Sequence, residues 1–115
     1  MKIVVTERIA DEGIEYLKKN GFEVDTTYGM PREELLGIIQ NYDAIIVRSV
    51  TKVNRELIEK GVKLKVAGRA GNGIDNIDVP TCTQKGIVVV NTPDSNSMAA
   101  AELAIGLAYC VFRFI

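Results

Sequence analysis

The fold is decided by residues 42–49, YDAIIVRS, in which four consecutive apolar residues lie between polar neighbours. The run Ala44-Ile45-Ile46-Val47 has no polar position that could face water, and three of its four residues are β-branched. A short run of this kind is typical of a strand in a parallel sheet whose two faces are both covered by helices. We therefore expect residues 44–47 to form a central strand of an α/β domain.

Strands and helices alternate on both sides of this central run. Further strands are predicted at residues 2–6, 22–26, 64–68 and 87–90, and helices at residues 9–20, 31–40, 55–60 and 79–85. Asn54 and Asp78 are expected to cap the helices that follow them, and Gly21, Gly61 and Gly86 to end helices. This spacing predicts an α/β, flavodoxin-like, five-stranded parallel sheet with helices on both faces and strand order 2-1-3-4-5.

The last segment differs from the rest because it is apolar around almost its whole circumference. Between Met98 and Phe112 the only charge is Glu102, and Ser97 is placed to cap a helix. The run is shorter than the roughly 20 residues of a membrane span, and a helix apolar all round is normally a buried one. We expect residues 1–96 to form the domain and residues 97–115 to form a crossover helix that packs on a second domain, which makes the chain the front part of a longer protein.

Length, charge and composition exclude several classes of function. The chain has 115 residues, 14 basic against 15 acidic side chains, a net charge of -1 and no histidine. This length suits one domain, and the balanced charge argues against a general nucleic-acid or membrane-surface binder. Without histidine the chain alone carries neither imidazole catalysis nor a histidine-ligated zinc. Cys82 and Cys110 match no metal or disulfide spacing, so we expect no metal site, reduced thiols and a cytoplasmic protein without a signal peptide.

A cationic edge is predicted where the strands end. Ligands of open α/β sheets bind outside the carboxyl ends of the strands, and here Arg48-Ser49 and Arg69 directly follow predicted strands. Either arginine alone would ordinarily be interpreted as part of a surface salt bridge. Their joint placement favours a site for a phosphate or carboxylate.

The glycine-rich stretch after the fourth predicted strand is not a dinucleotide-binding motif. Residues 71–76, GNGIDN, begin like GxGxxG, but Asn76 replaces the third glycine, and Asp75 and Asp78 stand where a pyrophosphate would lie. Gly71 and Gly73 permit positive φ, so backbone amides around Asn72 and Gly73 could converge on an anion. A tight strand-to-helix turn with no ligand is the alternative for this loop.

Several blocks of sequence together resemble the D-2-hydroxyacid dehydrogenase family. They are RSVTKV at 48–53, GRAGNGIDNID at 68–78, NTP at 91–93 and NSMAAAEL at 96–103, in the family's order and spacing across the whole chain. The resemblance implies that this region is a flavodoxin-like substrate-binding domain. It further implies an NAD-binding Rossmann domain of the same polypeptide, which begins after the helix near Ser97.

The resemblance also implies roles for five residues. Arg48, Ser49 and Arg69 would hold the phosphate side of a phosphorylated 2-hydroxy acid, and the backbone amides of Asn72 and Gly73 would hold its carboxylate. Asn72 would lie beside the nicotinamide of NAD, and it departs from the small or β-branched residue common there in the family. The family's catalytic arginine, glutamate and histidine belong to the later domain, so no catalytic residue is expected in this chain and the fragment alone is expected to be inactive.

Other functions are considered beside this one. The chain could belong to a D-2-hydroxyacid dehydrogenase with another substrate, or be a stand-alone anion-binding or oligomerisation module, and a homo-oligomer is expected because the apolar last helix would self-associate. A receiver domain is disfavoured because it needs an acidic pair after the first strand and an aspartate after the third, where this chain has Thr6-Glu7 and Arg48. A flavodoxin is disfavoured because residues 7–10, ERIA, are no Ser/Thr-rich phosphate loop.

Overall fold

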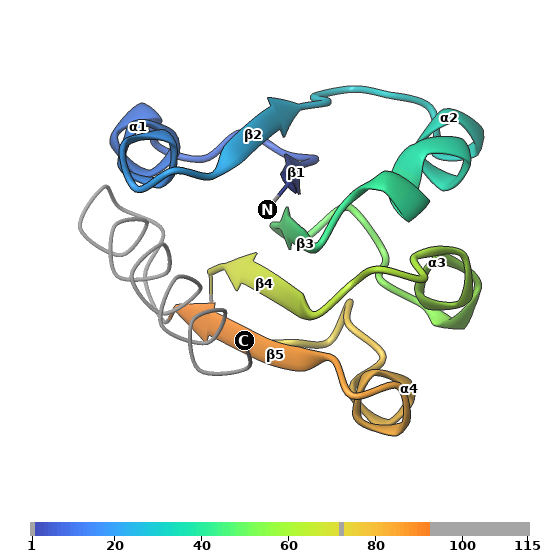
Figure 1. Cartoon of the computed structure of the whole chain (residues 1–115). Helices are drawn as coiled ribbons and strands as arrows, with labels where there is room; N and C mark the ends of the chain where they lie inside the picture. The colour runs from blue at the N-terminus through green and yellow to red at the C-terminus, as the bar shows by residue number, and fades with distance from the viewer. Residues whose placement is uncertain (1, 72, 93–115) are drawn as a thin grey trace.

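The computed structural model describes residues 2–71 and 73–92, in which strands and helices alternate along the chain (Figure 1). The strands are β1 (Lys2–Val5), β2 (Glu23–Thr26), β3 (Ala44–Val47), β4 (Val66–Ala70) and β5 (Val88–Thr92). The helices are α1 (Asp11–Lys19), α2 (Arg32–Ile38), α3 (Arg55–Lys60) and α4 (Val79–Gln84), with a 3-10 turn, η1 (Ile39–Asn41), after α2.

The strands form one parallel sheet in the order β2-β1-β3-β4-β5, which confirms the predicted topology. β3 lies at its centre, where Ile45 pairs with Val4 of β1 and with Ala67 of β4. All four residues of β3 are buried, as expected for a strand covered on both faces.

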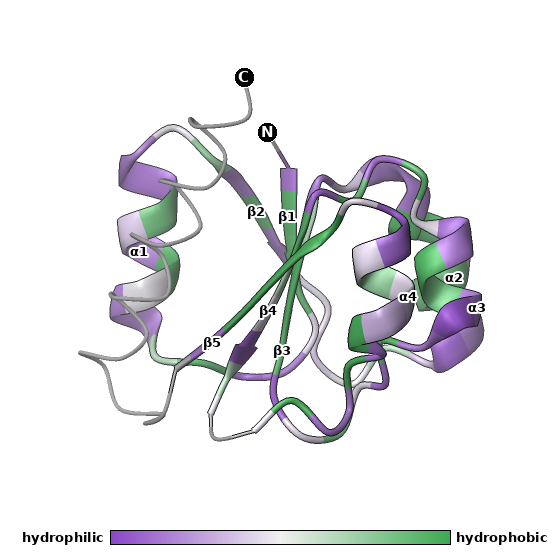
Figure 2. Ribbon diagram, turned by 90° about the horizontal axis from the view of Figure 1, so that it is seen from below, coloured by the Kyte–Doolittle hydropathy of each residue, from purple (hydrophilic) through white to green (hydrophobic). Residues whose placement is uncertain are grey.

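Successive residues of the central strands face opposite layers of helix. Val5 and Ile46 pack in the cluster under α1, whereas Val4 and Ile45 pack in the cluster under α2, α3 and α4. Figure 1 shows α1 on one side of the sheet and the other three helices on the opposite side. In Figure 2 the inner strand β3 is green, the colour of apolar residues, whereas the edge strand β2 and the helices also carry purple, hydrophilic residues. The prediction of helices on both faces is therefore confirmed.

The fourth strand was predicted two residues too early. It spans Val66–Ala70 and not residues 64–68, because Leu64 belongs to a turn in which its amide donates to the Gly61 carbonyl at 3.0 Å. The side chain of Leu64 is apolar and packs against the helices, so in the sequence it cannot be distinguished from a buried strand residue. Arg69 consequently lies within β4, where it pairs with Val47 and Asn91, and does not follow the strand as expected.

Gly61 ends α3 as predicted, but for a different physical reason from the other helix-ending glycines. Gly21 and Gly86 have φ of +90° and +74°, the left-handed conformation expected after a helix, whereas Gly61 has φ of -82°. A Cβ at Gly61 would overlap the side chain of Leu64. Glycine at this position therefore allows the turn to pack closely on α3.

The predictions for the last segment concern residues that the structure does not describe. The helix expected from Met98 and the domain boundary at residue 96 both fall within residues 93–115. Within the described residues, no helix is long and apolar enough to cross a membrane.

Substituting two glycines by alanine should have opposite effects on stability. Gly61→Ala should lower the free energy of unfolding by about 1–3 kcal/mol, because the new methyl group displaces the buried Leu64 side chain. At the exposed Gly37 of α2, a new Cβ would meet no atom within 4 Å, so Gly37→Ala should raise the free energy of unfolding by about 0.5–1 kcal/mol. Urea unfolding followed by circular dichroism measures both, and equal effects of the two substitutions would contradict the steric argument.

Candidate functional site

The carboxyl edge of the sheet holds the loop that joins β3 to α3, residues 48–54, which we call the β3–α3 loop. Glu7, in the connection after β1, accepts hydrogen bonds from three backbone amides of this loop. Its Oε2 lies 2.6 Å from the Arg48 nitrogen and 3.1 Å from the Thr51 nitrogen, and its Oε1 lies 2.9 Å from the Val50 nitrogen. Partial burial opposes ionisation of Glu7, but the three amide hydrogen bonds outweigh it and lower the pKa of the carboxyl group.

Asn76 contacts the same loop from the other side. The residue is only 4% exposed. Its Nδ2 donates hydrogen bonds to the carbonyl oxygens of Arg48 at 2.6 Å and of Thr51 at 2.7 Å. Its Oδ1 accepts a hydrogen bond from Arg69 Nη1 at 2.6 Å. The sequence shows Asn76 only as a departure from a glycine motif, since its contacts with the β3–α3 loop are made with residues 25 and 28 positions away.

Arg69 is largely enclosed and bonded within the chain. Its side chain is 12% exposed, and Nη1 also pairs with the exposed Asp75 carboxylate at 2.5 Å. The hydrogen bond from Arg69 holds the pKa of the Asp75 carboxyl group below its ordinary value. Arg69 Nε is buried without a hydrogen-bond partner among the described residues. This arginine thus enters the edge with its charge already partly neutralised.

Arg48 and Ser49 are both exposed at the carboxyl edge. The guanidinium of Arg48 reaches the carbonyl oxygen of Arg8, with 3.3 Å between Nη1 and the oxygen. Arg48 and Arg69 therefore have different partners. They are linked indirectly, because the amide of Asn76 bonds to the Arg48 carbonyl and to the Arg69 side chain.

The glycine loop adopts the backbone conformations that its sequence predicts. Gly71 and Gly73 have φ of +151° and +76°, whereas Asn72 lies outside the described residues, so the amide site predicted around it stays a prediction. Asp78 caps α4, since its Oδ1 accepts a hydrogen bond from the Thr81 nitrogen at 3.2 Å. Among the described residues, no cluster of cysteine and carboxylate side chains could hold a metal ion.

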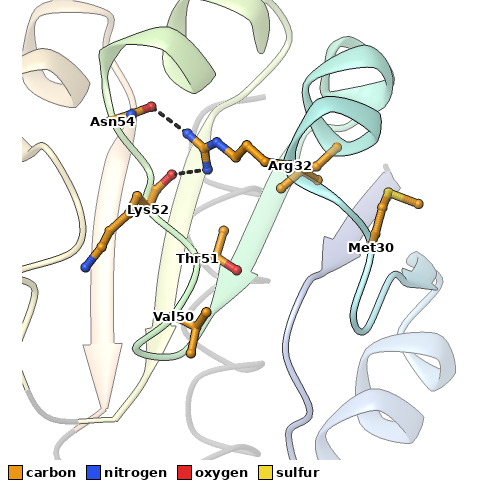
Figure 3. Close-up of a pocket in the computed structure, with 7 residues that line it drawn as sticks. Met30, Arg32, Val50, Thr51, Lys52 and Asn54 are labelled. Atoms are coloured by element: carbon orange, nitrogen blue, oxygen red, sulfur yellow. Dashed lines mark hydrogen bonds between the residues drawn. The ribbon is translucent and has the colours of Figure 1, made fainter.

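A cavity of 330 Å³ lies beside the β3–α3 loop (Figure 3). Its walls are formed by Met30, Arg32, Leu35, Val50, Thr51, Lys52 and Asn54. Arg32 extends from α2 and donates to the Lys52 carbonyl at 2.6 Å and to Asn54 Oδ1 at 2.7 Å, which are the two dashed bonds of Figure 3. The sequence pattern does not single out Arg32. It stands at the start of a helix with acidic residues in its first turn, which is a common arrangement.

The chain is similar to known proteins over most of its length. The family model described as D-isomer specific 2-hydroxyacid dehydrogenase, catalytic domain, matches residues 3–109. A D-3-phosphoglycerate dehydrogenase of Archaeoglobus fulgidus is 50% identical over 115 residues, which are 100% of this chain and 22% of that protein. The chain thus spans about a fifth of the length of this relative.

Solved structures agree with the sheet and its connections. A protein from Pyrococcus horikoshii aligns with a TM-score of 0.74 and 38% identity over 78% of this chain and 27% of its own. The NAD+-bound 3-phosphoglycerate dehydrogenase of Entamoeba histolytica aligns with a TM-score of 0.68 and 39% identity over 80% of this chain and 32% of its own.

Replacing the Glu7 carboxylate by an amide should change stability in a pH-dependent way. Glu7→Gln should lower the free energy of unfolding at pH 7 by about 1–2 kcal/mol, because charge-assisted bonds to three amides are weakened at a partly exposed position. The folded-state pKa lies below the ordinary 4.5, so this contribution is complete above pH 4.5 and is lost as the pH falls through the lower folded value. Urea unfolding of both proteins between pH 3 and 7 measures the difference, and a difference that stays constant would contradict the role of the charge.

Proposed function

The chain belongs to the D-isomer specific 2-hydroxyacid dehydrogenase family, and we propose that it forms the substrate-binding part of a D-3-phosphoglycerate dehydrogenase. The proposal depends on one observation above the others. Arg48 directly follows β3 and Arg69 lies in the neighbouring strand β4, and Asn76 bonds to both residues at the carboxyl edge of the sheet, where their positive charges can receive an anionic substrate.

The proposed reaction is the oxidation of 3-phosphoglycerate at its 2-hydroxyl group to 3-phosphohydroxypyruvate, a step of serine biosynthesis. A hydride leaves C2 for NAD, and the hydroxyl proton passes to a base. In this chain Arg48, Ser49 and Arg69 hold the phosphate side of the substrate, and the backbone amides of Asn72 and Gly73 hold its carboxylate. The chain has no histidine, so an imidazole base would come from another part of the polypeptide.

The glycine loop fits the proposed approach of the nicotinamide. Gly71 and Gly73 carry no side chain beyond the backbone, and Gly73 is exposed, so a flat ring could lie against the loop next to Asn72. NAD would accept the hydride when bound, and we expect most of its contacts to come from a Rossmann domain of the same polypeptide. We propose residues 1–96 as the substrate-binding domain and residues 97–115 as the connecting helix.

The chain alone should produce no NADH. Incubated with 3-phosphoglycerate and NAD, the 115-residue protein should show no increase in absorbance at the NADH wavelength, because the groups that hold NAD and take the proton are expected elsewhere. The complete polypeptide under the same conditions is the control. Turnover by the 115-residue chain would contradict the division of roles.

Removing either site arginine should weaken the use of the phosphorylated substrate. In the complete polypeptide, Arg48→Ala or Arg69→Ala should raise KM for 3-phosphoglycerate by about tenfold to a hundredfold, the value of a lost charge-assisted hydrogen bond. Arg55→Ala, which removes the same charge from an exposed pair with Glu59 on α3, should change KM by less than about twofold.

The comparison with D-glycerate, which lacks the phosphate group, separates two roles of the arginines. A group that holds the phosphate should matter much more for kcat/KM with 3-phosphoglycerate than with D-glycerate. Equal losses for the two substrates would contradict the phosphate-binding role, and an unchanged KM in both variants would contradict the proposed site.

A further inference from the structure

We propose that Asn76 is a positioning residue, which holds the β3–α3 loop and the Arg69 guanidinium together in one arrangement. The inference rests on the proposed function, because Arg48 and Ser49 of that loop and Arg69 are the residues assigned to the substrate. Asn76 itself does not touch the substrate in this proposal. It acts through the groups to which it is hydrogen-bonded.

The side-chain amide of Asn76 is fully used inside the protein. Both Nδ2 contacts are backbone carbonyls, those of Arg48 and Thr51, and the Oδ1 contact is the Nη1 donor of Arg69. A flipped amide would direct its oxygen at two carbonyl oxygens and its nitrogen at a guanidinium, so the network permits only one orientation. At 4% exposure, water cannot readily replace these partners.

The backbone of Asn76 is anchored as well. Its carbonyl oxygen accepts a hydrogen bond from the Val53 nitrogen at 2.9 Å, and the Val53 carbonyl accepts one from the Asp78 nitrogen at 2.9 Å. These bonds attach the end of the β3–α3 loop to the segment that begins α4. A displacement of Asn76 would therefore move both segments. The backbone bonds thus keep the Asn76 side chain within hydrogen-bond distance of the Arg48 carbonyl oxygen.

Glu7 and Asn76 bind opposite polar groups of the same loop. Glu7 accepts from the amides of Arg48, Val50 and Thr51, and Asn76 donates to the carbonyls of Arg48 and Thr51. The peptide group before Ser49 is thereby held by Asn76, and the one after it by Glu7. Of this pair, Asn76 is the one that also reaches Arg69, so its side chain connects the loop to the guanidinium.

Asp75 is a natural comparison because it bonds to the same Nη1 of Arg69. Its side chain is 83% exposed, and an ion pair so exposed contributes little in water. The bond to Asn76 is made with a buried side chain, away from most of the solvent that surrounds Asp75, and is expected to dominate the orientation of the guanidinium.

Steady-state kinetics of the complete polypeptide test the proposal. Asn76→Ala should raise KM for 3-phosphoglycerate by about tenfold, while KM for NAD changes by less than about twofold, since the loop and Arg69 serve the substrate. Asp75→Asn, the matched control, should change KM for 3-phosphoglycerate by less than about twofold. In the Arg69→Ala background, Asn76→Ala should raise KM for 3-phosphoglycerate by a much smaller factor than it does in the wild type, because part of its effect passes through Arg69. Fully additive effects, or an unchanged KM in Asn76→Ala, would overturn the proposal.

Hydrogen exchange of the wild type tests it without any substitution or substrate. In nuclear magnetic resonance spectra, the Nδ2 protons of Asn76 should exchange with solvent at least about tenfold more slowly than those of the exposed Asn41. Exchange as fast as that of Asn41 would overturn the positioning role even if Asn76→Ala failed to fold. If the wild-type enzyme did not oxidise 3-phosphoglycerate, the proposed function would fail, whereas slow exchange would still support the arrangement around Asn76.

Discussion

Burial of β3 on both faces is the constraint on which the rest of the structure depends. This strand pairs with a parallel neighbour on each edge, and its four apolar residues pack under α1 on one side and under three helices on the other. Parallel strands bring their carboxyl ends to one edge of the sheet. The connections after β1, β3 and β4 are therefore brought together, and those of their polar groups that are shielded from water must be satisfied by one another or by a ligand.

The edge answers this requirement with side chains from distant parts of the sequence. Glu7 accepts hydrogen bonds from loop amides that could otherwise bind an anion. Asn76 donates hydrogen bonds to carbonyl oxygens of the same loop. Arg69 is met by Asp75 and Asn76, and Arg32 by the Lys52 carbonyl and Asn54. The loop is thus ordered before any substrate arrives, which reduces the entropic cost of binding.

Charge and burial divide these contacts by strength. The carboxylate of the Arg69–Asp75 pair is exposed and screened by water, so this ion pair should contribute little. The Asn76 side chain is buried, so leaving its amide without partners would incur the cost of an unsatisfied buried polar group.

The sequence by itself determined the parallel α/β sheet, its strand order, the caps at Asn54 and Asp78 and the positive φ of Gly71 and Gly73. These features follow from apolar periodicity and from residues whose preferences act over a few positions. It misplaced β4, because a buried turn residue, Leu64, resembles a strand residue. Only the tertiary structure showed the roles of Glu7, Asn76 and Arg32. Their partners in the β3–α3 loop lie from 20 to 44 positions away in the chain, and such pairs become neighbours only when the sheet aligns its strand ends.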